Sequence, residues 1–200
     1  MGEEMIRGAR GAASAIPVAL ILAAAASRLI PHPPNMTPVT AIALFGAWQY
    51  GWRGWWKGAV SVGLPLAALF LSDVALNNLV YRMGVESGGV VWFYPGAGWT
   101  YLSMALVVAW GWLSLRRFSA VRLAGASVVG SLLFFAVSNF GVWASFDMYP
   151  HTAAGLMECY VAGIPFLGNA LIGDLVFTGV LFGAFWLATR GLVAREPVEA

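Results

Sequence analysis

Two aspartates lie inside long apolar segments of this 200-residue sequence, Asp73 in the third such segment and Asp174 in the sixth. A carboxylate at the centre of a bilayer costs at least about 2.5–3.5 kcal/mol, so such a residue normally faces the protein interior and has a partner or a function. Arg28 is the nearest cation by its expected depth. Two interpretations stay open: an Arg28–aspartate ion pair that fixes the register of the helices, and a role of the aspartates in binding a ligand.

Three connections between apolar segments, 31–35, 83–97 and 145–163, hold both histidines, the single cysteine and a dense set of aromatic residues. This concentration predicts a recognition surface on one side of a membrane, although tryptophan and tyrosine also collect at any membrane interface. The candidate substrate-binding residues are Arg28, His32, Asn35, Asp73, Trp92, Tyr94, Tyr149, His151, Cys159, Tyr160, Asn169 and Asp174. Asn139 lies in mid-segment, where a hydrogen bond between helices is expected.

Signatures of catalysis are missing from the sequence. It has no Gly-Lys-Ser/Thr phosphate loop and no His-Glu-x-x-His, and neither histidine lies in an apolar segment where it could activate a buried serine. We therefore expect a protein that is not an enzyme and has no resident cofactor. A membrane-embedded enzyme with Asp73 or Asp174 as general base, and a small transporter in which these aspartates relay protons, remain alternatives.

The amino-acid composition indicates whether the chain lies in water or in a membrane. Hydrophobic residues make up 60% of the chain, charged residues only 10%, and the net charge is +2, whereas a soluble domain has about 25% charged residues. The sequence predicts an integral membrane protein with no nucleic-acid partner. With Cys159 as the only cysteine, no internal disulfide can form, and His151 with Cys159 would offer a soft metal only two ligands.

The apolar runs predict an all-α protein of one domain, residues 1–200, with six transmembrane helices. Their expected ranges are 12–30, 38–52, 57–80, 98–115, 121–144 and 164–189. With both termini inside, the inner segments hold nine basic residues, and the outer ones hold only Arg28 and Arg82; the nine are Arg7, Arg10, Arg53, Lys57, Arg116, Arg117, Arg122, Arg190 and Arg195. This bias predicts cytoplasmic termini and a multi-pass membrane protein.

The first segment allows two further alternatives. Its basic start, apolar run and Ala24-Ala25-Ala26 are also compatible with a cleaved secretory signal, which would leave five helices; we favour retention because the run continues to Ile30. Ala15, Ala19 and Ala23 form a stripe of small residues at every fourth position. Such a stripe suits close helix contact, either within the chain or with a separate membrane subunit.

Several sequence blocks resemble a family of small bacterial membrane proteins assigned to transport without an established function. The match runs from about Arg28 to about Gly183. The blocks are Pro31-His32-Pro33-Pro34-Asn35, Thr37-Pro38, Ala43-Leu44-Phe45-Gly46, Leu71-Ser72-Asp73, Asn139-Phe140-Gly141-Val142-Trp143, Tyr149-Pro150, Cys159-Tyr160, Ile164-Pro165-Phe166 and Gly173-Asp174. That family in turn is similar to the substrate-binding S-components of energy-coupling-factor (ECF) vitamin transporters, in length, helix number, orientation and the small-residue stripe.

These resemblances imply a protein of the bacterial cytoplasmic (inner) membrane. The S-component resemblance also implies capture of a vitamin-like micronutrient in an outward cavity. It also implies docking onto a transmembrane coupling subunit with two ATPases, followed by toppling of the protein in the bilayer. Some relatives of that group transport cobalamin, and one type holds the cobalt through a cysteine. Cobalamin is therefore the leading substrate expectation, with Cys159 as a ligand only through the cobalt of that compound.

Overall fold

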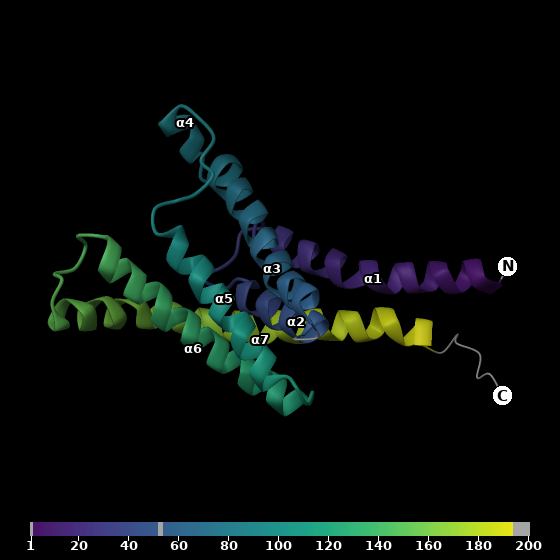
Figure 1. Ribbon diagram of the computed structural model, residues 1–200. Helices are drawn as coiled ribbons and strands as arrows, with labels where there is room; N and C mark the ends of the chain where they lie inside the picture. The colour runs from purple at the N-terminus through teal and green to yellow at the C-terminus, as the bar shows by residue number, and fades with distance from the viewer. Residues whose placement is uncertain (1, 52–53, 194–200) are drawn as a thin grey trace.

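The computed structural model describes residues 2–51 and 54–193, with side chains placed in 15–51, 54–85 and 88–190. Throughout this part the chain forms helices and no strand. The helices are α1 (Gly2–Ser27), α2 (Val39–Tyr50), α3 (Trp55–Ala75) with the π-helical turn η1 (Leu76–Val80), α4 (Met83–Ser87), α5 (Ala97–Ser114), α6 (Ala120–Ser145) and α7 (Ala153–Val193). The all-helical prediction is confirmed within these residues (Figure 1).

The helix α7 differs most from its expected range. It begins at Ala153 and not at residue 164, so the connection to α6 is short and Cys159 lies within the helix. The expected boundary relied on Gly163 and Pro165, yet Pro165 is accommodated inside α7. At 1.5 Å per residue the 41 residues of α7 extend about 60 Å, roughly twice the thickness of a hydrocarbon core.

Within the described residues, three helices are long and apolar enough to cross a membrane: Trp55–Val80, Ala120–Ser145 and Ala153–Arg190. The stretch Ala15–Ser27 of α1 is a shorter apolar helix. With 12 residues, α2 extends only about 18 Å, less than the roughly 30 Å of a hydrocarbon core. The sequence therefore encodes a helical protein with membrane-spanning segments, and crossing by all six predicted segments stays a prediction.

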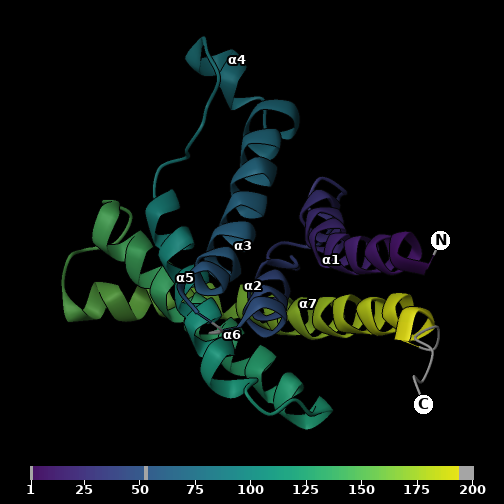
Figure 2. The ribbon, with the colours of Figure 1, turned by 45° about the vertical axis from the view of Figure 1, so that its right-hand side comes forward.

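The short helix α2 forms the centre of the molecule. It contacts each of the long helices, which are α1, α3, α5, α6 and α7. Its residues 39–47 are all buried. Figures 1 and 2 show α2 at the crossing point of the long helices, with the end of α1 that carries the N-terminus and the end of α7 that carries the C-terminus extending to the same side. Since other helices surround α2, its length need not match the membrane.

Small residues allow these helices to approach closely. A Cβ at Gly46 of α2 would lie 2.5 Å from Pro65 Cγ of α3, and one at Gly111 of α5 would lie 2.6 Å from Ala47 Cβ. Next to them, the Phe45 ring meets the Phe182 ring edge-on at 5.2 Å. Because lipid provides no hydrophobic drive between helices, such close contact is the main attraction that holds them together.

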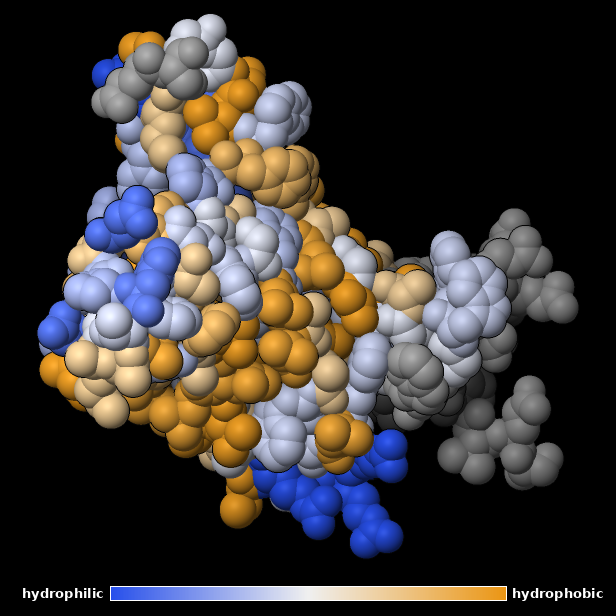
Figure 3. All heavy atoms as spheres, turned by 60° about the vertical axis from the view of Figure 1, so that its left-hand side comes forward, coloured by the Kyte–Doolittle hydropathy of each residue, from blue (hydrophilic) through white to orange (hydrophobic). Residues whose placement is uncertain are grey.

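The outer surface is largely apolar, as a lipid-facing surface must be. Figure 3 shows a broad hydrophobic belt across the middle and a hydrophilic group at the lower end. Leu71, Ile164 and Val180 are more than half exposed, at 59%, 57% and 61%. The turn between α5 and α6, the lowest part of Figure 1, carries exposed Arg116 and Arg117. This distribution fits a membrane protein.

Candidate functional site

A cavity of about 240 Å³ lies beside the N-terminal end of α2, between α6 and α7 and next to the connection from α1 to α2. Its polar lining consists of Asn35, Thr37, Thr40, Thr100, Ser131, Ser138, Asn139 and Asp174. Its apolar lining consists of Val39, Phe134, Phe135, Phe166, Leu167 and Ala170. A concave wall that combines apolar surface with convergent polar groups is typical of a small-molecule site. The cavity contains Asn35 and Asp174 from the candidate residues.

Asp174 is the charged residue of the cavity, and it is only 4% exposed. Ser131 on α6 donates a hydrogen bond of 2.6 Å to its Oδ2. Thr40 presents both its hydroxyl and its backbone N–H to the same carboxyl group. Thr40 is the second residue of α2, and the first N–H groups of a helix have no partner within it. The carboxylate of Asp174 therefore supplies an acceptor to the free N-terminal end of α2.

The connection 31–37 is fixed over the cavity by its backbone. Met36 N–H donates to Pro33 O at 3.1 Å, which closes a turn with Asn35 at φ 62°. Asparagine is one of the few residues that adopt this left-handed conformation readily, so the turn aims Asn35 at the cavity as a well-defined group. Asn169 on α7 donates 3.1 Å to Pro34 O. This candidate residue therefore anchors the connection and is not part of the cavity wall.

Close contact between this connection and α7 requires glycine. A Cβ at Gly173 would lie 2.8 Å from Met36 Cγ and 3.0 Å from Met36 Cα. Gly173 directly precedes Asp174, so the close approach positions the loop next to the carboxylate.

Asn139 lines the cavity, but its hydrogen bond differs from the prediction. Its Nδ2 donates to Phe135 O at 2.9 Å, within its own helix α6, and not to another helix. A Cβ at Gly163 of α7 would lie 2.7 Å from Asn139 Oδ1, so the two helices are in close contact at this level.

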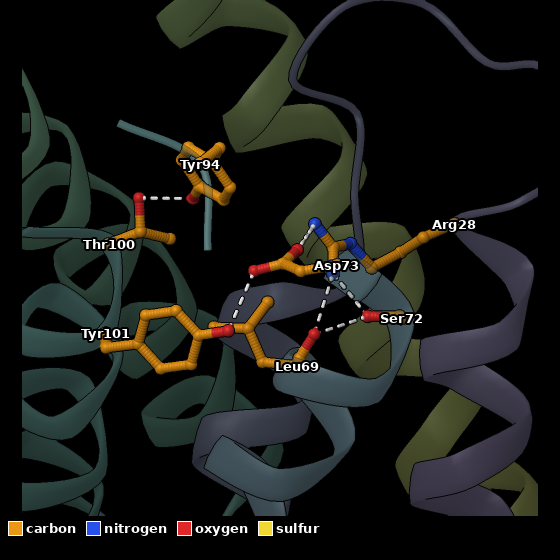
Figure 4. A network of polar contacts seen from close by, with 7 residues as sticks. All are labelled: Arg28, Leu69, Ser72, Asp73, Tyr94, Thr100 and Tyr101. Carbon is orange, nitrogen blue, oxygen red and sulfur yellow. Dashed lines mark hydrogen bonds and ion pairs between the residues drawn. The ribbon is translucent and has the colours of Figure 1, made fainter. Parts of the chain in front are cut away.

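The second aspartate, Asp73, belongs to a separate polar network (Figure 4). Arg28 Nη2 lies 2.7 Å from Asp73 Oδ1, with the side chains 12% and 4% exposed. Arg28 also donates to the Ser72 hydroxyl, and the Tyr101 hydroxyl donates to Asp73 Oδ2 at 3.1 Å. These contacts join the end of α1 to α3 and α5. Of the two interpretations open for Asp73, the geometry favours the ion pair that fixes helix register.

Tyr94 connects this region to the cavity. Its hydroxyl donates to Thr100 Oγ1 at 2.8 Å, and Thr100 lines the main cavity. Burial raises the pKa of the Tyr94 phenol, so it stays protonated and keeps the donor role. Thr100 and Ser138 also line a neighbouring cavity of about 110 Å³ that contains Tyr94 and Trp99. The two cavities therefore share a wall, and the candidate Tyr94 lies at the smaller one.

Four candidate residues of the connections lie outside both cavities. His32 is exposed, with Nδ1 3.0 Å from the neighbouring Pro33 O. Trp92 is 57% exposed and stacks on Phe70 with ring centroids 6.4 Å apart. Exposed His151 meets the Trp143 ring at 5.6 Å, and Tyr149 is half-buried in the α6–α7 turn. The structure does not gather these residues into one site.

Cys159 and Tyr160 contribute to contact between α6 and α7. Cys159 is 2% exposed and its Sγ lies 3.3 Å from Asn139 O, while Tyr160 donates to Ala136 O at 2.7 Å. Cys159 is not part of the cavity lining. Among the residues described, no group of three or more His, Cys, Asp and Glu side chains is placed to hold a metal ion.

The small-residue stripe of α1 faces outward. Ala15, Ala19 and Ala23 are exposed, whereas Ile21 and Ala25 on the opposite face are buried against the protein. In the part of the chain that the structure describes, these three residues are therefore not buried by contact with other helices.

Sequence reasoning missed Ser131 and Thr40, the donors to Asp174. The spacing of serines in α6 could have indicated Ser131. Ser127, Ser131 and Ser138 recur on one face of this helix, with spacings of four and seven residues. The partner stripe on α7 is Asp174 and Thr178, and Thr178 lies 3.4 Å from the Ser127 hydroxyl. No comparable pattern surrounds Thr40, whose role depends on the position of α2.

Comparison with known proteins gives one finding. A family described as "Family of unknown function (DUF6580)" matches residues 10–195. No curated protein matches the chain, and no solved structure does.

Proposed function

Since the chain belongs to the DUF6580 family, whose function is unknown, we propose a function from its cavity: a membrane transport protein that binds a small, vitamin-like micronutrient for uptake. The observation that carries the proposal is the cavity of about 240 Å³ with Asp174 and Asn35 in its wall. Two segments far apart in the sequence, the connection 31–37 and α7, build this wall together. The protein binds its substrate without converting it, so it is not an enzyme.

The size of the cavity favours a compact substrate. Pockets for drug-sized ligands have volumes of about 300–1,000 Å³, and this cavity lies just below that range. A cobalamin is several times larger, and Cys159 as its cobalt ligand lies buried between α6 and α7. Binding of cobalamin would require α6 and α7 to separate. We therefore give preference to a smaller micronutrient.

The membrane arrangement that we propose has six crossings with both termini cytoplasmic, as in an ECF S-component of the bacterial inner membrane. The alternating distribution of basic residues supports it, and the burial of α2 offers a reason why its crossing can be short. The outward stripe of Ala15, Ala19 and Ala23 supports docking of a transmembrane coupling subunit with its ATPases on α1.

The test is the small molecule that remains bound to the purified protein. Native mass spectrometry of the full chain, released from detergent, should detect one compound in equal amount with the protein. An Ala170→Phe variant places a ring into the cavity wall and should lose that compound. Ala162→Phe on the exposed face of the same helix is the matched control and should keep it.

The outcomes separate the alternatives. Equal retention of the compound by Ala170→Phe and Ala162→Phe would refute a site in this cavity. Recovery of a chemically changed product after incubation would favour the enzyme, and proton-coupled flux through liposomes that contain only this protein would favour the secondary transporter.

A further inference from the structure

The charge of the cavity indicates which class of compound it accepts. Among the lining residues, Asp174 is the only one that ionises, and no lysine, arginine or histidine belongs to the lining. Arg28, the nearest cation expected from the sequence, is engaged with Asp73 at 2.7 Å. The cavity therefore contains a carboxylate without a cationic partner among its own walls.

Neutral dipoles around this carboxyl group favour its ionised form, against the effect of burial, which disfavours a charge. Ser131 donates to it at 2.6 Å, and the hydroxyl and backbone N–H of Thr40 face it from the N-terminal end of α2. A helix N-terminus carries a partial positive charge that favours an anion. These groups stabilise a negative charge but do not neutralise it, so ionised Asp174 has no counter-charge among the lining residues.

The same arrangement disfavours an anionic ligand. Asp174 already faces the donors at the N-terminal end of α2, and the carboxylate of a bound anion would meet like charge in a desolvated site. Like charges at close range repel each other strongly where water is excluded. The polar groups around Asp174 therefore exclude the ligand class that a free helix N-terminus would attract.

The remaining wall is suited to a cation with an apolar body. Phe134, Phe135 and Phe166 line the cavity, and aromatic faces attract ammonium groups, most strongly where water is excluded. Val39, Leu167 and Ala170 provide further apolar surface. A ligand with one positive nitrogen thus finds a counter-charge, and the rest of it finds apolar contact.

We infer that the cavity binds a small organic cation, a protonated or quaternary amine on an apolar or aromatic body, with its nitrogen next to the carboxylate of Asp174. This inference rests on the proposed function and names the substrate class of that site. The positive charge on the bound nitrogen neutralises the carboxylate of Asp174. The ligand itself therefore supplies the partner that a buried carboxylate needs.

Three probes of nearly equal shape test the charge requirement: benzylamine as the cation, benzyl alcohol as the neutral compound and benzoate as the anion. Their binding to the full chain in detergent at neutral pH is measured by calorimetry, or by displacement of the compound that copurifies. We expect benzylamine to bind at least about tenfold more tightly than benzyl alcohol, and benzoate most weakly.

Two variants assign the preference to one residue. Asp174→Asn keeps the shape and can still accept from Ser131, and it should reduce the preference for benzylamine to less than about threefold. Glu158→Gln removes an exposed carboxylate from the same helix and should leave the preference unchanged. If Asp174→Asn does not fold, the order of the three probes on the unmodified chain remains the test.

The results distinguish this inference from the proposed function. Benzyl alcohol or benzoate could bind as tightly as benzylamine or more tightly, and Ala170→Phe could abolish that binding. This result would refute a cationic ligand but would support the cavity as the binding site. A copurifying compound without a basic or quaternary nitrogen would do the same. If none of the three probes binds, the inference of a cationic ligand is also refuted. If no compound copurifies either, the proposed function is refuted as well.

Discussion

Removing Arg28 should destabilise the protein far more than removing any exposed arginine. Arg28 and Asp73 form an ion pair at 2.7 Å with side chains 12% and 4% exposed, and Arg28 also binds Ser72. In an Arg28→Met variant, Asp73 loses its cationic partner and keeps the Tyr101 hydroxyl, which donates from 3.1 Å. Breaking one side of a buried pair typically costs about 3–5 kcal/mol, because a charge stays buried without its partner. We expect a loss near the lower end, because the Tyr101 contact remains.

The measurement is the free energy of unfolding of the detergent-solubilised protein, titrated with a denaturing detergent. Arg82→Met is the matched control, because Arg82 is the other arginine of the expected outer side and is exposed. Its removal should change stability by less than about 0.5 kcal/mol. A double variant, Arg28→Met with Asp73→Leu, should recover most of the loss, because an apolar pair can replace a buried ion pair at little cost.

Recovery in the double variant should not be complete. Tyr101 then has a half-buried hydroxyl without its acceptor, which costs about 1 kcal/mol, the lower end of the range for such a group. If Arg28→Met cost no more than Arg82→Met, or if the two single losses simply added in the double variant, the ion pair would not fix the helices and the reasoning would be wrong.

Three further predictions concern the cavity and the membrane arrangement. Gly173→Val should weaken binding of the copurified compound, because a side chain there displaces the loop over the cavity; retention equal to the unmodified chain in mass spectrometry would contradict this. Asn35→Val should lower stability by about 1–2 kcal/mol and Asn35→Gly should not, because φ is 62° at this position; equal melting temperatures would refute the assignment. In a Cys159→Ser background, an impermeant thiol reagent should label Val90→Cys from outside the cell but not Arg117→Cys, and the reverse pattern would reject the proposed topology.

Local patterns in the sequence were sufficient to predict the helical segments of the fold. Composition and long apolar runs predict membrane helices because the backbone must satisfy its own hydrogen bonds in lipid, and the structure describes helices at each expected position. The exception is the start of α7. Gly163 and Pro165 suggested a boundary, but contact with α6 through Cys159 and Tyr160 continues past them.

For the candidate site, the sequence identified the polar residues that are costly in a membrane but not their partners. Asp73, Asp174 and Asn35 stood out because apolar surroundings do not favour such side chains, and two of them line the cavity. The sequence left open which aspartate Arg28 would meet. That depended on where the end of α1 lies relative to α3, and the structure assigns Arg28 to Asp73.

The sequence by itself therefore determined the class of protein, its helical segments and the unusual cost of its buried carboxylates, because these follow from the chemistry of single residues and from periodicity. Only the tertiary structure decided that Thr40 and Ser131, ordinary hydroxyl residues, meet Asp174, and that Cys159 does not. Their role depends on α2 lying against both α6 and α7, a contact between segments about 90 and 130 residues apart. Spacing along one chain carries no information about such a meeting.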